Sequence, residues 1–442
     1  MDKVIDMPKA ARKIIEVLNK NGYDAYIVGG CVRDSLLGKK PNDWDITTSA
    51  LPLEVKKIFQ KTVDTGLKHG TVTVLMDHDQ YEVTTFRIDG DYLDGRHPDS
   101  VSFTGLLSED LKRRDFTINA MAYHPSEGVV DLFGGEEDLK KGIIRCVGNP
   151  EHRFSEDALR MMRAIRFSAQ LGFEIDKDTY NAICKLSDTL AKISSERIRD
   201  EMVKLLVSDN PMMFKLFYDT GLTKVFLPEF DELMLTKQNH IHHIYDVGEH
   251  TLHSIDNIRN DKTLRLAMLF HDIGKPLTLS LDEEGVTHFY GHPAKSAKML
   301  EDIMGRLNFD NETINLAKVL VLNHDRNVEC NLKSVRKAIN VLGMEVFPLL
   351  MEVKRADVYA QSDYMREEKL ATIEKLLELY NEIKERGEPV TTKQLAVSGK
   401  DLIEKGIKQG PEIGNILTKM LEDVLEEPSH NDKEYLLSEY VK

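Results

Sequence analysis

Two aspartates placed two residues apart, Asp43 and Asp45, are the first residues of the chain with an evident chemical use. They border a β-like run at 44–48, and in a strand the side chains of residues i and i+2 point to the same face. Two such carboxylates repel each other unless a cation lies between them, and oxygen ligands suit hydrated Mg²⁺ at a triphosphate. Glu82, in the β-like run 81–86, is either a third carboxylate of this site or an exposed strand residue. The pattern predicts a catalytic magnesium site.

A glycine pair precedes these aspartates. Gly29 and Gly30 follow a β-like run at 25–28 and lead into a predicted helix at 32–37. Glycine lets the backbone approach a phosphate closely, and the free N–H groups of a helix N-terminus attract an anion. Arg33 adds a guanidinium that can donate two hydrogen bonds to phosphate oxygens. Together with the aspartates, these residues favour a nucleoside-triphosphate site over a plain turn.

A second set of residues in the later half of the chain has the composition of a metal centre: His250, His271, Asp272, His292, His324 and Asp357. Imidazole and carboxylate ligands suit Mn, Fe, Ni or Zn, whereas Mg²⁺ prefers more oxygen. A metal bound there would activate water for attack on a phosphoester. His240, His242 and His243 fall outside the set, and we expect them at the surface or at a substrate entrance. Lys275 is either a phosphate contact or a helix cap.

The elements that must position these residues change in character along the chain. Residues 6–20 have helical spacing, and β-like runs rich in Val, Thr and Tyr follow as far as residue 86. Helical spacing then dominates from about residue 150. The fold class we expect is α+β, with an N-terminal head of mixed sheet and helices followed by all-α regions. The boundaries we expect are 1–145, 146–235, 236–365 and 366–442.

Composition narrows the function classes. The chain has 442 residues, with 59 Lys and Arg against 74 Asp and Glu, a net charge of −15. This balance does not favour bulk, non-specific nucleic-acid binding, although it leaves room for a local basic groove. The four cysteines are too scattered for a disulfide framework or a zinc ribbon. We expect no signal peptide, no membrane partner and a cytoplasmic location.

Four collinear segments resemble the motifs of one superfamily. The segment 29–50, GGCVRDSLLGKKPNDWDITTSA, is similar to the first motif of class II tRNA nucleotidyltransferases and bacterial poly(A) polymerases. Segments 110–122, 131–139 and 156–167 resemble the second, third and fourth motifs. The resemblance implies that Asp43 and Asp45 hold two Mg²⁺ ions. One ion would lower the pKa of the tRNA 3′-OH, and the other would stabilise the pyrophosphate leaving group.

The fourth motif carries charged residues three or four positions apart: Glu156, Asp157, Arg160, Arg163 and Arg166. This spacing predicts a shared helix face, which by itself more often carries salt bridges. An aspartate acceptor beside a forked arginine donor can also read the Watson–Crick edge of a base. The resemblance implies that Asp157 and Arg160 select CTP and ATP without a nucleic-acid template, and that Arg114 and Arg163 contact the nucleotide. Arg113 is either an RNA contact or a structural salt bridge.

Three further segments separate the branches of the superfamily. Residues 64–76, DTGLKHGTVTVLM, resemble the CCA-adding branch rather than the poly(A) branch. Residues 87–103 resemble the flexible loop implicated in the switch from CTP to ATP, which favours complete CCA addition. Residues 395–432 resemble the C-terminal region of bacterial CCA-adding enzymes, which implies a grip on the tRNA elbow as well as on its 3′ acceptor end. In that region Lys400, Lys405 and Lys408 are either tRNA contacts or solvated surface residues.

The sequence HDIGKP, 271–276, resembles the signature of HD-domain phosphohydrolases. That resemblance implies that adjacent His271 and Asp272 both bind metal, and that the domain hydrolyses phosphates or 2′,3′-cyclic phosphodiesters. The function we expect is a CCA-adding tRNA nucleotidyltransferase that uses Mg²⁺, CTP, ATP and tRNA. The expected regions are a catalytic head, a neck with the template motif, a metal-binding HD domain and a tRNA-binding tail. The alternatives are a poly(A) polymerase, or an HD-domain phosphohydrolase with a tRNA-binding head.

Overall fold

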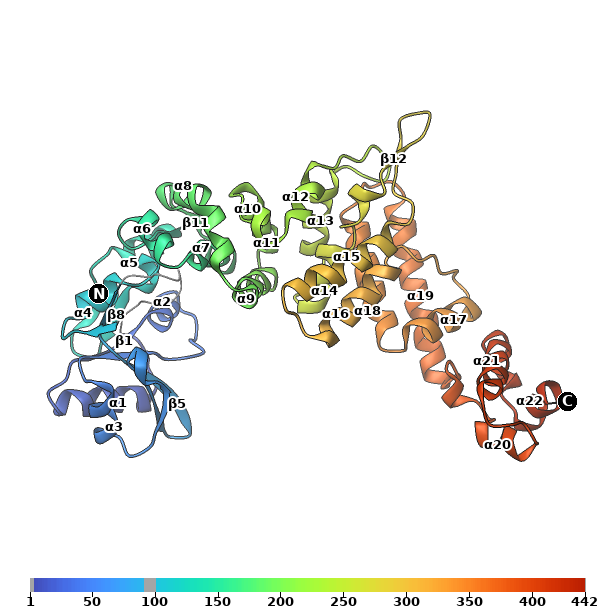
Figure 1. Cartoon of the computed structure of the whole chain (residues 1–442), viewed down its shortest axis with the longest axis horizontal. Coiled ribbons are helices and arrows are strands. Elements are labelled where there is room, and N and C mark those ends of the chain that lie inside the picture. Colours follow the sequence, from blue (N-terminus) through green and yellow to red (C-terminus); the bar gives the residue numbers. More distant parts are fainter. Residues whose placement is uncertain (1–3, 91–100, 442) are drawn as a thin grey trace. The chain divides into compact units, whose positions relative to one another are not determined.

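The computed structural model describes residues 4–90 and 101–441, and the chain forms two compact units (Figure 1). Unit 1 is Met1–Pro228 and unit 2 is Glu229–Lys442. Unit 1 holds a mixed sheet followed by helices, and unit 2 is built mostly of helices. The expected α+β class, with a mixed-sheet head and an all-α remainder, is therefore confirmed. The central part of the expected loop at 87–103, residues 91–100, lies outside the described residues.

The sheet of unit 1 has seven strands in the order β3-β4-β5-β2-β1-β8-β9. Strands β2 and β5 pair in parallel, and the other neighbours pair antiparallel. The strand bounds are β1 Ala25–Val28, β2 Ile46–Thr48, β3 Thr62–Gly66, β4 Thr71–Met76, β5 Asp79–Thr85, β8 Met121–His124 and β9 Gly128–Asp131. A separate hairpin pairs β6 Arg87–Asp89 with β7 Val101–Phe103. The β1–β2–β5 centre of the sheet thus brings the end of β1 and the start of β2 together.

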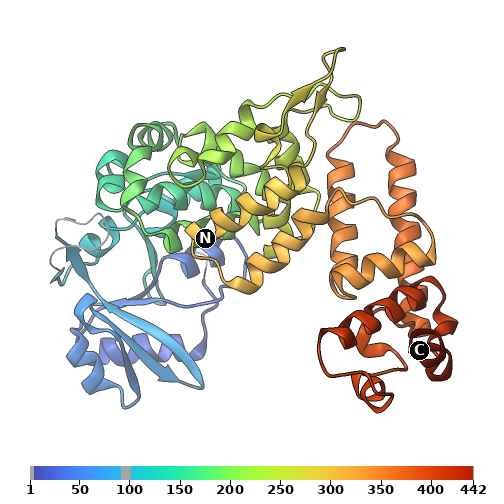
Figure 2. The ribbon, with the colours of Figure 1, turned by 45° about the vertical axis from the view of Figure 1, so that its right-hand side comes forward.

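Helices cover this sheet because their apolar side chains repeat with the helical period. Helix α1, Lys9–Lys20, buries Ala10, Ala11, Ile14, Ile15 and Leu18, the face that the spacing predicts. It packs with α3, Pro52–Ile58, against the sheet, whose strands are blue in Figure 2. Three short helices complete the head: α2 Gly30–Leu36, α4 Leu107–Lys112 and α5 Gly135–Lys141.

The rest of unit 1 is helical. The helices there are α6 Pro150–Glu156, α7 Leu159–Leu171, α8 Lys177–Leu186, α9 Ser195–Leu206, α10 Lys215–Asp219 and α11 Thr223–Phe226. Side-chain caps mark the starts of two of these helices. Asn149, directly before Pro150, accepts a hydrogen bond from the His152 N–H at the start of α6, and Asp176 accepts one from the Thr179 N–H at the start of α8. Helices α7 and α9 lie against each other and form the axis of this region.

Unit 2 begins within the first turn of α12, Pro228–Leu235, and a set of packed helices surrounds its buried core. The helices are α13 Val247–Asp256, α14 Lys262–Phe270, α15 His292–Arg306, α16 Asn311–Asn323, α17 Leu332–Leu342, α18 Val346–Tyr359 and α19 Arg366–Arg386. A small hairpin pairs β12 Ser280–Leu281 with β13 Thr287–His288. Helices α18 and α19, drawn in orange, run side by side (Figure 2).

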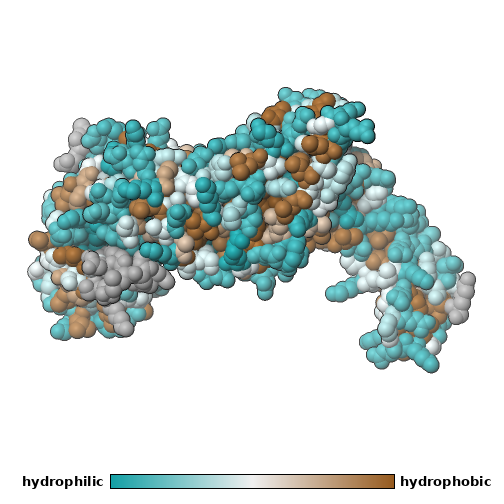
Figure 3. All heavy atoms as spheres, turned by 45° about the horizontal axis from the view of Figure 1, so that its top comes forward, coloured by the Kyte–Doolittle hydropathy of each residue, from teal (hydrophilic) through white to brown (hydrophobic). Residues whose placement is uncertain are grey.

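The chain ends in α20 Gly399–Glu404, α21 Pro411–Glu426 and α22 Lys433–Tyr440. These helices enclose a small core of their own, formed by Val397, Leu402, Met420, Val424 and Leu436. The face in Figure 3 is mostly hydrophilic, with hydrophobic residues in scattered patches. In the part of the chain that the structure describes, no helix combines the length and the apolar character that crossing a membrane requires.

Candidate functional site

The two aspartates of the first motif lie at the end of an extended segment, directly before β2. The prediction placed them in a strand from residue 44, but the pairing with β5 begins only at Ile46, opposite Val83. The Asp45 carbonyl still accepts a hydrogen bond from the Val28 N–H at 3.0 Å, so the segment stays extended beside β1. Both carboxylates are exposed to solvent, where an ion and a triphosphate can reach them.

Negative charge is concentrated around Asp45. Desolvation and the charges of Asp43 and Glu82 raise the pKa of Asp45 to about 6, and the positive charge of Arg114 opposes this shift only in part. Glu82 is exposed on β5, opposite Thr73 of β4. A divalent cation would relieve this repulsion, and the all-oxygen donor set suits Mg²⁺. The residues present therefore fit the ion that the first motif implies.

Arg114 occupies the space that Gly29 leaves open. Gly29 has φ +85°, and a Cβ added there would lie 2.9 Å from Arg114 Nη1, so both the backbone angle and the close approach require glycine. Among the described atoms, Arg114 Nε is buried without a hydrogen-bond partner. Its guanidinium lies 3.5 Å from the buried Asp110, which also pairs with Arg113 at 2.8 Å. Arg113 thus takes the structural salt bridge that the sequence left as one alternative.

The Arg33 side chain is more buried than that of an arginine whose only role is to contact a phosphate. Its Nη1 donates to Asn119 Oδ1 at 2.7 Å and its Nε donates to Asp34 at 2.8 Å. Asn119 in turn donates to Asp115, which accepts two hydrogen bonds from Arg163 at 2.8 and 2.5 Å. This chain of polar contacts connects α2, the second motif and α7, so both arginines serve at least to fix the walls of the site.

The fourth motif does not form one helix face, and that prediction is wrong. Helix α6 ends at Glu156, and Asp157 adopts φ −143° and ψ 103° before α7 begins at Leu159. A local hydrogen bond stabilises this break between the helices: the Asp157 carboxylate accepts from the Leu159 N–H at 3.1 Å, the contact of an Asx turn. Arg160, on the first turn of α7, pairs with Glu156 at 2.5 Å.

Spacing also could not reveal the partner of Asp157. Arg197, in the first turn of α9, donates from Nη2 to Asp157 Oδ2 at 2.8 Å and from Nη1 to Oδ1 at 3.4 Å. The sequence analysis did not single out Arg197, nor Asp110, Asp115 and Asn119 of the second motif. A charged residue at the start of a helix carries no signal that identifies such a partner.

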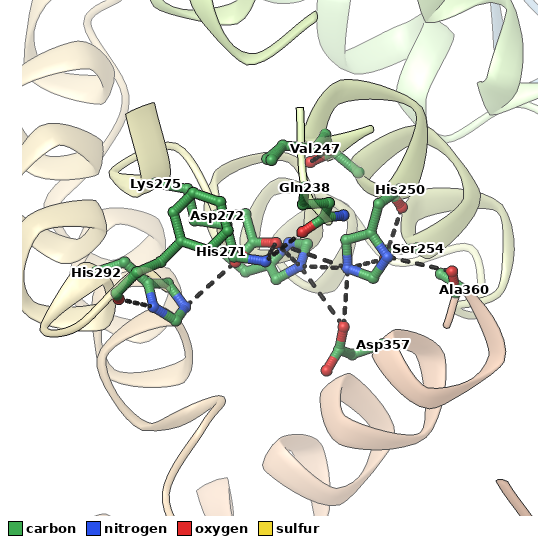
Figure 4. Close-up of polar contacts among 12 residues, drawn as sticks. Gln238, Val247, His250, Ser254, His271, Asp272, Lys275, His292, Asp357 and Ala360 are labelled. Carbon is green, nitrogen blue, oxygen red and sulfur yellow. Dashed lines mark hydrogen bonds and ion pairs between the residues drawn. The ribbon is translucent and has the colours of Figure 1, made fainter. Parts of the chain in front are cut away.

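The histidine–aspartate set of unit 2 comes together from five elements (Figure 4). His250 lies in α13, His271 and Asp272 directly follow α14, His292 opens α15, His324 caps α16, and Asp357 lies in α18. Two groups have ligand atoms within 4.8 Å of one another: His250, His271 and Asp272, and Asp272, His292 and His324. Asp357 contacts the first group, 2.9 Å from His250 Nε2. All six predicted residues are therefore neighbours, and Asp272 belongs to both groups.

Every histidine of this cluster is held by the same device. Nδ1 lies 2.7–3.2 Å from a backbone carbonyl oxygen: Ala360 for His250, Met268 for His271, Phe289 for His292 and Val321 for His324. A carbonyl can only accept, so Nδ1 carries the proton and, in a neutral ring, Nε2 keeps its lone pair. Such backbone contacts are typical of metal-binding histidines, whose free nitrogen they orient.

The free nitrogens face one another in pairs. His250 Nε2 lies 3.3 Å from His271 Nε2, and His292 Nε2 lies 3.1 Å from His324 Nε2. In each pair the two nitrogens are close enough to bind one cation together. Burial and the charge of His271 lower the pKa of His324 to about 3, which keeps that ring neutral. The residues present therefore fit a metal with a preference for nitrogen.

A cavity of about 680 Å³ opens on the cluster. Its lining includes His240, His242 and His243, which agrees with the expectation that they lie at an entrance. Lys275 also lines it and pairs with Asp272 at 2.7 Å, so neither of its two expected roles describes its contact here.

Three family models match the chain. The model described as "Poly A polymerase head domain" matches residues 25–145. "Probable RNA and SrmB- binding site of polymerase A" matches 172–234, and tRNA nucleotidyltransferase domain 2 matches 293–440. The first segment lies in unit 1, the second runs from unit 1 into the first residues of unit 2, and the third lies in unit 2.

Comparison with whole proteins gives a closer assignment. The chain is 36% identical over 442 residues to a CCA-adding enzyme of Ligilactobacillus salivarius, which covers 99% of this chain and 97% of that protein. It is 52% identical over 226 residues to a CCA-adding enzyme of Lactobacillus johnsonii, covering 50% of this chain and 57% of that protein. A crystal structure of the Bacillus stearothermophilus CCA-adding enzyme in complex with CTP matches with a TM-score of 0.71 and 32% identity, covering 98% of both chains. This chain belongs to the family of CCA-adding enzymes.

Proposed function

We propose that this nucleotidyltransferase adds C, C and A to the 3′ end of tRNA from CTP and ATP, with release of pyrophosphate, at the carboxylates of unit 1. The observation that carries the proposal is the crowding of negative charge at Asp45, to which Asp43 and Glu82 add and which Arg114 offsets only in part. Asp43 and Asp45 would hold Mg²⁺, which would lower the pKa of the attacking 3′-hydroxyl and stabilise the pyrophosphate leaving group. The solved relative in complex with CTP supports the nucleotide part of this proposal.

The protein residues divide the remaining work. Gly29 and Gly30 let the backbone approach the triphosphate, and Arg114 supplies the donor that its buried Nε leaves unused. The Arg33 and Arg163 side chains keep the second motif and α7 in register around the nucleotide. We keep these five residues as nucleotide-binding residues.

Asp157 and Arg160 would choose the base. Cytosine and adenine both present an amino donor beside a ring-nitrogen acceptor, whereas uracil and guanine present a carbonyl oxygen and a ring N–H there. The Asp157 carboxylate accepts from the amino group, and the Arg160 guanidinium donates to the ring nitrogen. One pair of side chains thus accepts C and A and repels U and G.

The test uses a tRNA transcript that lacks its 3′ CCA, incubated with Mg²⁺ and labelled CTP, ATP or both, with products resolved nucleotide by nucleotide. We expect two C from CTP alone, then one A and a stop when ATP is added. Asp45→Asn should lower the rate by at least about 10²-fold, since metal stabilisation is worth several kcal/mol. An unlimited A ladder on any RNA would contradict CCA addition in favour of poly(A) synthesis.

The remaining proposals concern the tail, the bounds of the regions and the location of the activity. We propose that the tail at 366–442 contacts the tRNA elbow, with Lys400, Lys405 and Lys408 exposed on it. The head is 1–145, the neck 146–235 and the HD region 236–365. Because tRNA is the substrate, we place the activity in the cytoplasm.

A second activity is proposed for unit 2, that of an HD-type phosphohydrolase. The observation in its favour is the pair of facing Nε2 contacts around Asp272, which fit Mn, Fe, Ni or Zn. A metal there would supply an activated water for attack on a phosphoester. Asp272 and Asp357 would complete the ligand set with the four histidines. Arg326, Lys354 and Lys369 line the cavity as cations for a phosphate. Phosphoester hydrolysis with Ni²⁺ or Mn²⁺ that His292→Ala abolishes would support this activity, and none with any of the four metals would refute it.

A further inference from the structure

The first half of helix α19 forms one wall of the cavity that opens on the unit 2 cluster. The residues that line the cavity from this helix are Lys369, Thr372, Ile373 and Leu376. Their spacing of three or four residues puts them on one face of the helix. The helix packs beside α18, which carries Asp357. Because α19 follows the HD region along the chain, this wall comes from the region proposed as the tail.

The ammonium of Lys369 is held next to the metal cluster. Its Nζ donates to Gln361 Oε1 at 2.6 Å, and Gln361 Nε2 donates in turn to Asp357 Oδ2 at 2.9 Å. Lys369 Nζ also donates to His242 Nδ1 at 3.1 Å, in the segment that lines the entrance. The lysine thus connects the cluster with the entrance, and it is two hydrogen bonds away from a proposed metal ligand.

Lys369 differs from its basic neighbours on α19 in its partners. Arg366 forms an ion pair with Asp363, and Lys375 forms one with Glu378 at 2.9 Å. Both hydrogen-bond partners of Lys369 are neutral, and within residues 4–90 and 101–441 no ion pair involves it. Its side chain is only partly exposed, so the charge is incompletely hydrated and favours an anionic partner. An anion that enters the cavity supplies that partner.

Beyond Lys369 the same wall is apolar. Ile373 and Leu376 lie about one and two turns further along α19, and Val328 and Val358 line the cavity with them. All four side chains are buried. An organic group attached to a phosphate would cover this apolar surface, whereas pyrophosphate would leave it in contact with water. The wall therefore suits a phosphate ester better than an inorganic phosphate chain.

We infer that α19 completes the unit 2 site for a phosphate ester with an apolar organic part: Lys369 binds the phosphate, and Ile373 and Leu376 contact the organic group. The inference rests on the phosphohydrolase activity proposed for unit 2 and names the class of its substrate. It also gives the tail a part in hydrolysis besides its proposed contact with tRNA. Lys369 is thus a substrate-binding residue and not a metal ligand.

The binding test uses the full-length protein loaded with Mn²⁺ and two phosphonates that cannot be hydrolysed. Calorimetry gives the Kd of phenylphosphonate, which carries an aromatic group, and of methylphosphonate, which carries none. We expect the wild type to bind phenylphosphonate about tenfold more tightly, since burial of an aromatic group is worth this order. Lys369→Met keeps an unbranched side chain but removes the charge, so both Kd values should rise about tenfold or more.

Two further variants separate the charge from the helix that carries it. Lys369→Arg retains the charge and should keep most of the affinity. Lys375→Met, on the same helix but outside the cavity lining, is the matched control and should keep the wild-type Kd. The metal content, measured by elemental mass spectrometry, should be equal in all of these proteins.

Hydrolysis of p-nitrophenyl phosphate supplies a second readout. Lys369→Met should raise KM about tenfold or more with kcat nearly unchanged, because the contact holds substrate and transition state alike. A wild-type Kd in Lys369→Met, or a loss of metal from it, would overturn the role of Lys369. Equal affinity of the wild type for the two phosphonates would overturn the contact with an organic group. Phosphonate binding that depends on Lys369, without hydrolysis by the wild type, would instead refute the proposed phosphohydrolase activity.

Discussion

Removing the one carboxylate shared by both halves of the unit 2 cluster should empty the whole centre. Asp272 is the only residue common to the two ligand groups, so Asp272→Ala takes a ligand from each. His324→Ala takes a ligand from one group alone. We therefore expect about two metal ions per chain in the wild type, one in His324→Ala and none in Asp272→Ala. The amounts are read by elemental mass spectrometry after dialysis against Mn²⁺ or Ni²⁺.

The same binding should appear as stability of unit 2. A ligand present at 100 times its Kd stabilises the folded state by about 2.7 kcal/mol. A domain of the size of Glu229–Lys442 gains about 2–4 °C in Tm for each kcal/mol. Saturating one site should thus raise the Tm of the unit 2 transition by about 5–11 °C in calorimetry.

The matched control is His288→Ala. His288 belongs to the same cavity, but its ring pairs with Asp282 on the hairpin instead of entering the cluster. It should bind the wild-type amount of metal and show the wild-type shift. A wild-type protein that binds less than half an ion per chain, with no shift in Tm, would show that the histidine pairs are packing contacts and not ligands.

Three further outcomes follow from unit 1. Glu201→Gln leaves the Arg166 guanidinium buried without its carboxylate, so the free energy of unfolding measured in urea should fall by about 3–5 kcal/mol. A fall of less than about 1 kcal/mol would mean that the Arg166 side chain relaxes into solvent. Burial acts to raise the pKa of Asp115, but the charge of its partner Arg163 outweighs burial and lowers that pKa to about 2. The Asp115 carboxylate therefore adds about 2 kcal/mol to the free energy of unfolding above pH 4, and this stabilisation is lost as the pH falls through 2. Urea midpoints of Asp115→Asn should therefore depend less on pH between 4 and 2 than those of the wild type, and parallel curves would contradict this. Gly29→Ala forces a Cβ against Arg114 and should slow nucleotide addition while the far-UV spectrum stays unchanged, so full activity would show that the loop adapts.

The parts of the fold that depend on periodicity could be predicted from the sequence. The buried face of α1 and the bounds of β1 coincide with the predicted ones, because each element repeats its apolar residues with one period. The start of β2 was placed two residues early. The aromatic side chain of Trp44 extended the predicted strand to residue 44, whereas the pairing of β2 with β5 begins only at Ile46.

The two candidate sites differ in how far their residues could be predicted. The unit 2 residues came together as predicted because their order along the chain is itself a signature, and they lie within or at the ends of helices that pack around one another. The Nδ1 contacts that orient the rings involve backbone carbonyls, which no residue pattern reveals. The fourth motif does not form a single helix because Asp157 accepts a hydrogen bond from the Leu159 N–H in a turn between α6 and α7, a local contact that spacing rules do not consider.

The donor chemistry of the two sites keeps them from competing for one ion. The aspartates of unit 1 offer oxygen alone, which suits Mg²⁺ and binds late first-row metals less well than imidazole does. The unit 2 cluster offers four imidazole nitrogens already oriented by their backbone contacts, which Mg²⁺ uses poorly. Under the two proposed functions, each unit would therefore select its metal by the atoms it presents. Phosphoryl transfer should then require Mg²⁺ and hydrolysis a transition metal, so assays of one chain with each metal would separate the two activities without a mutation in either site.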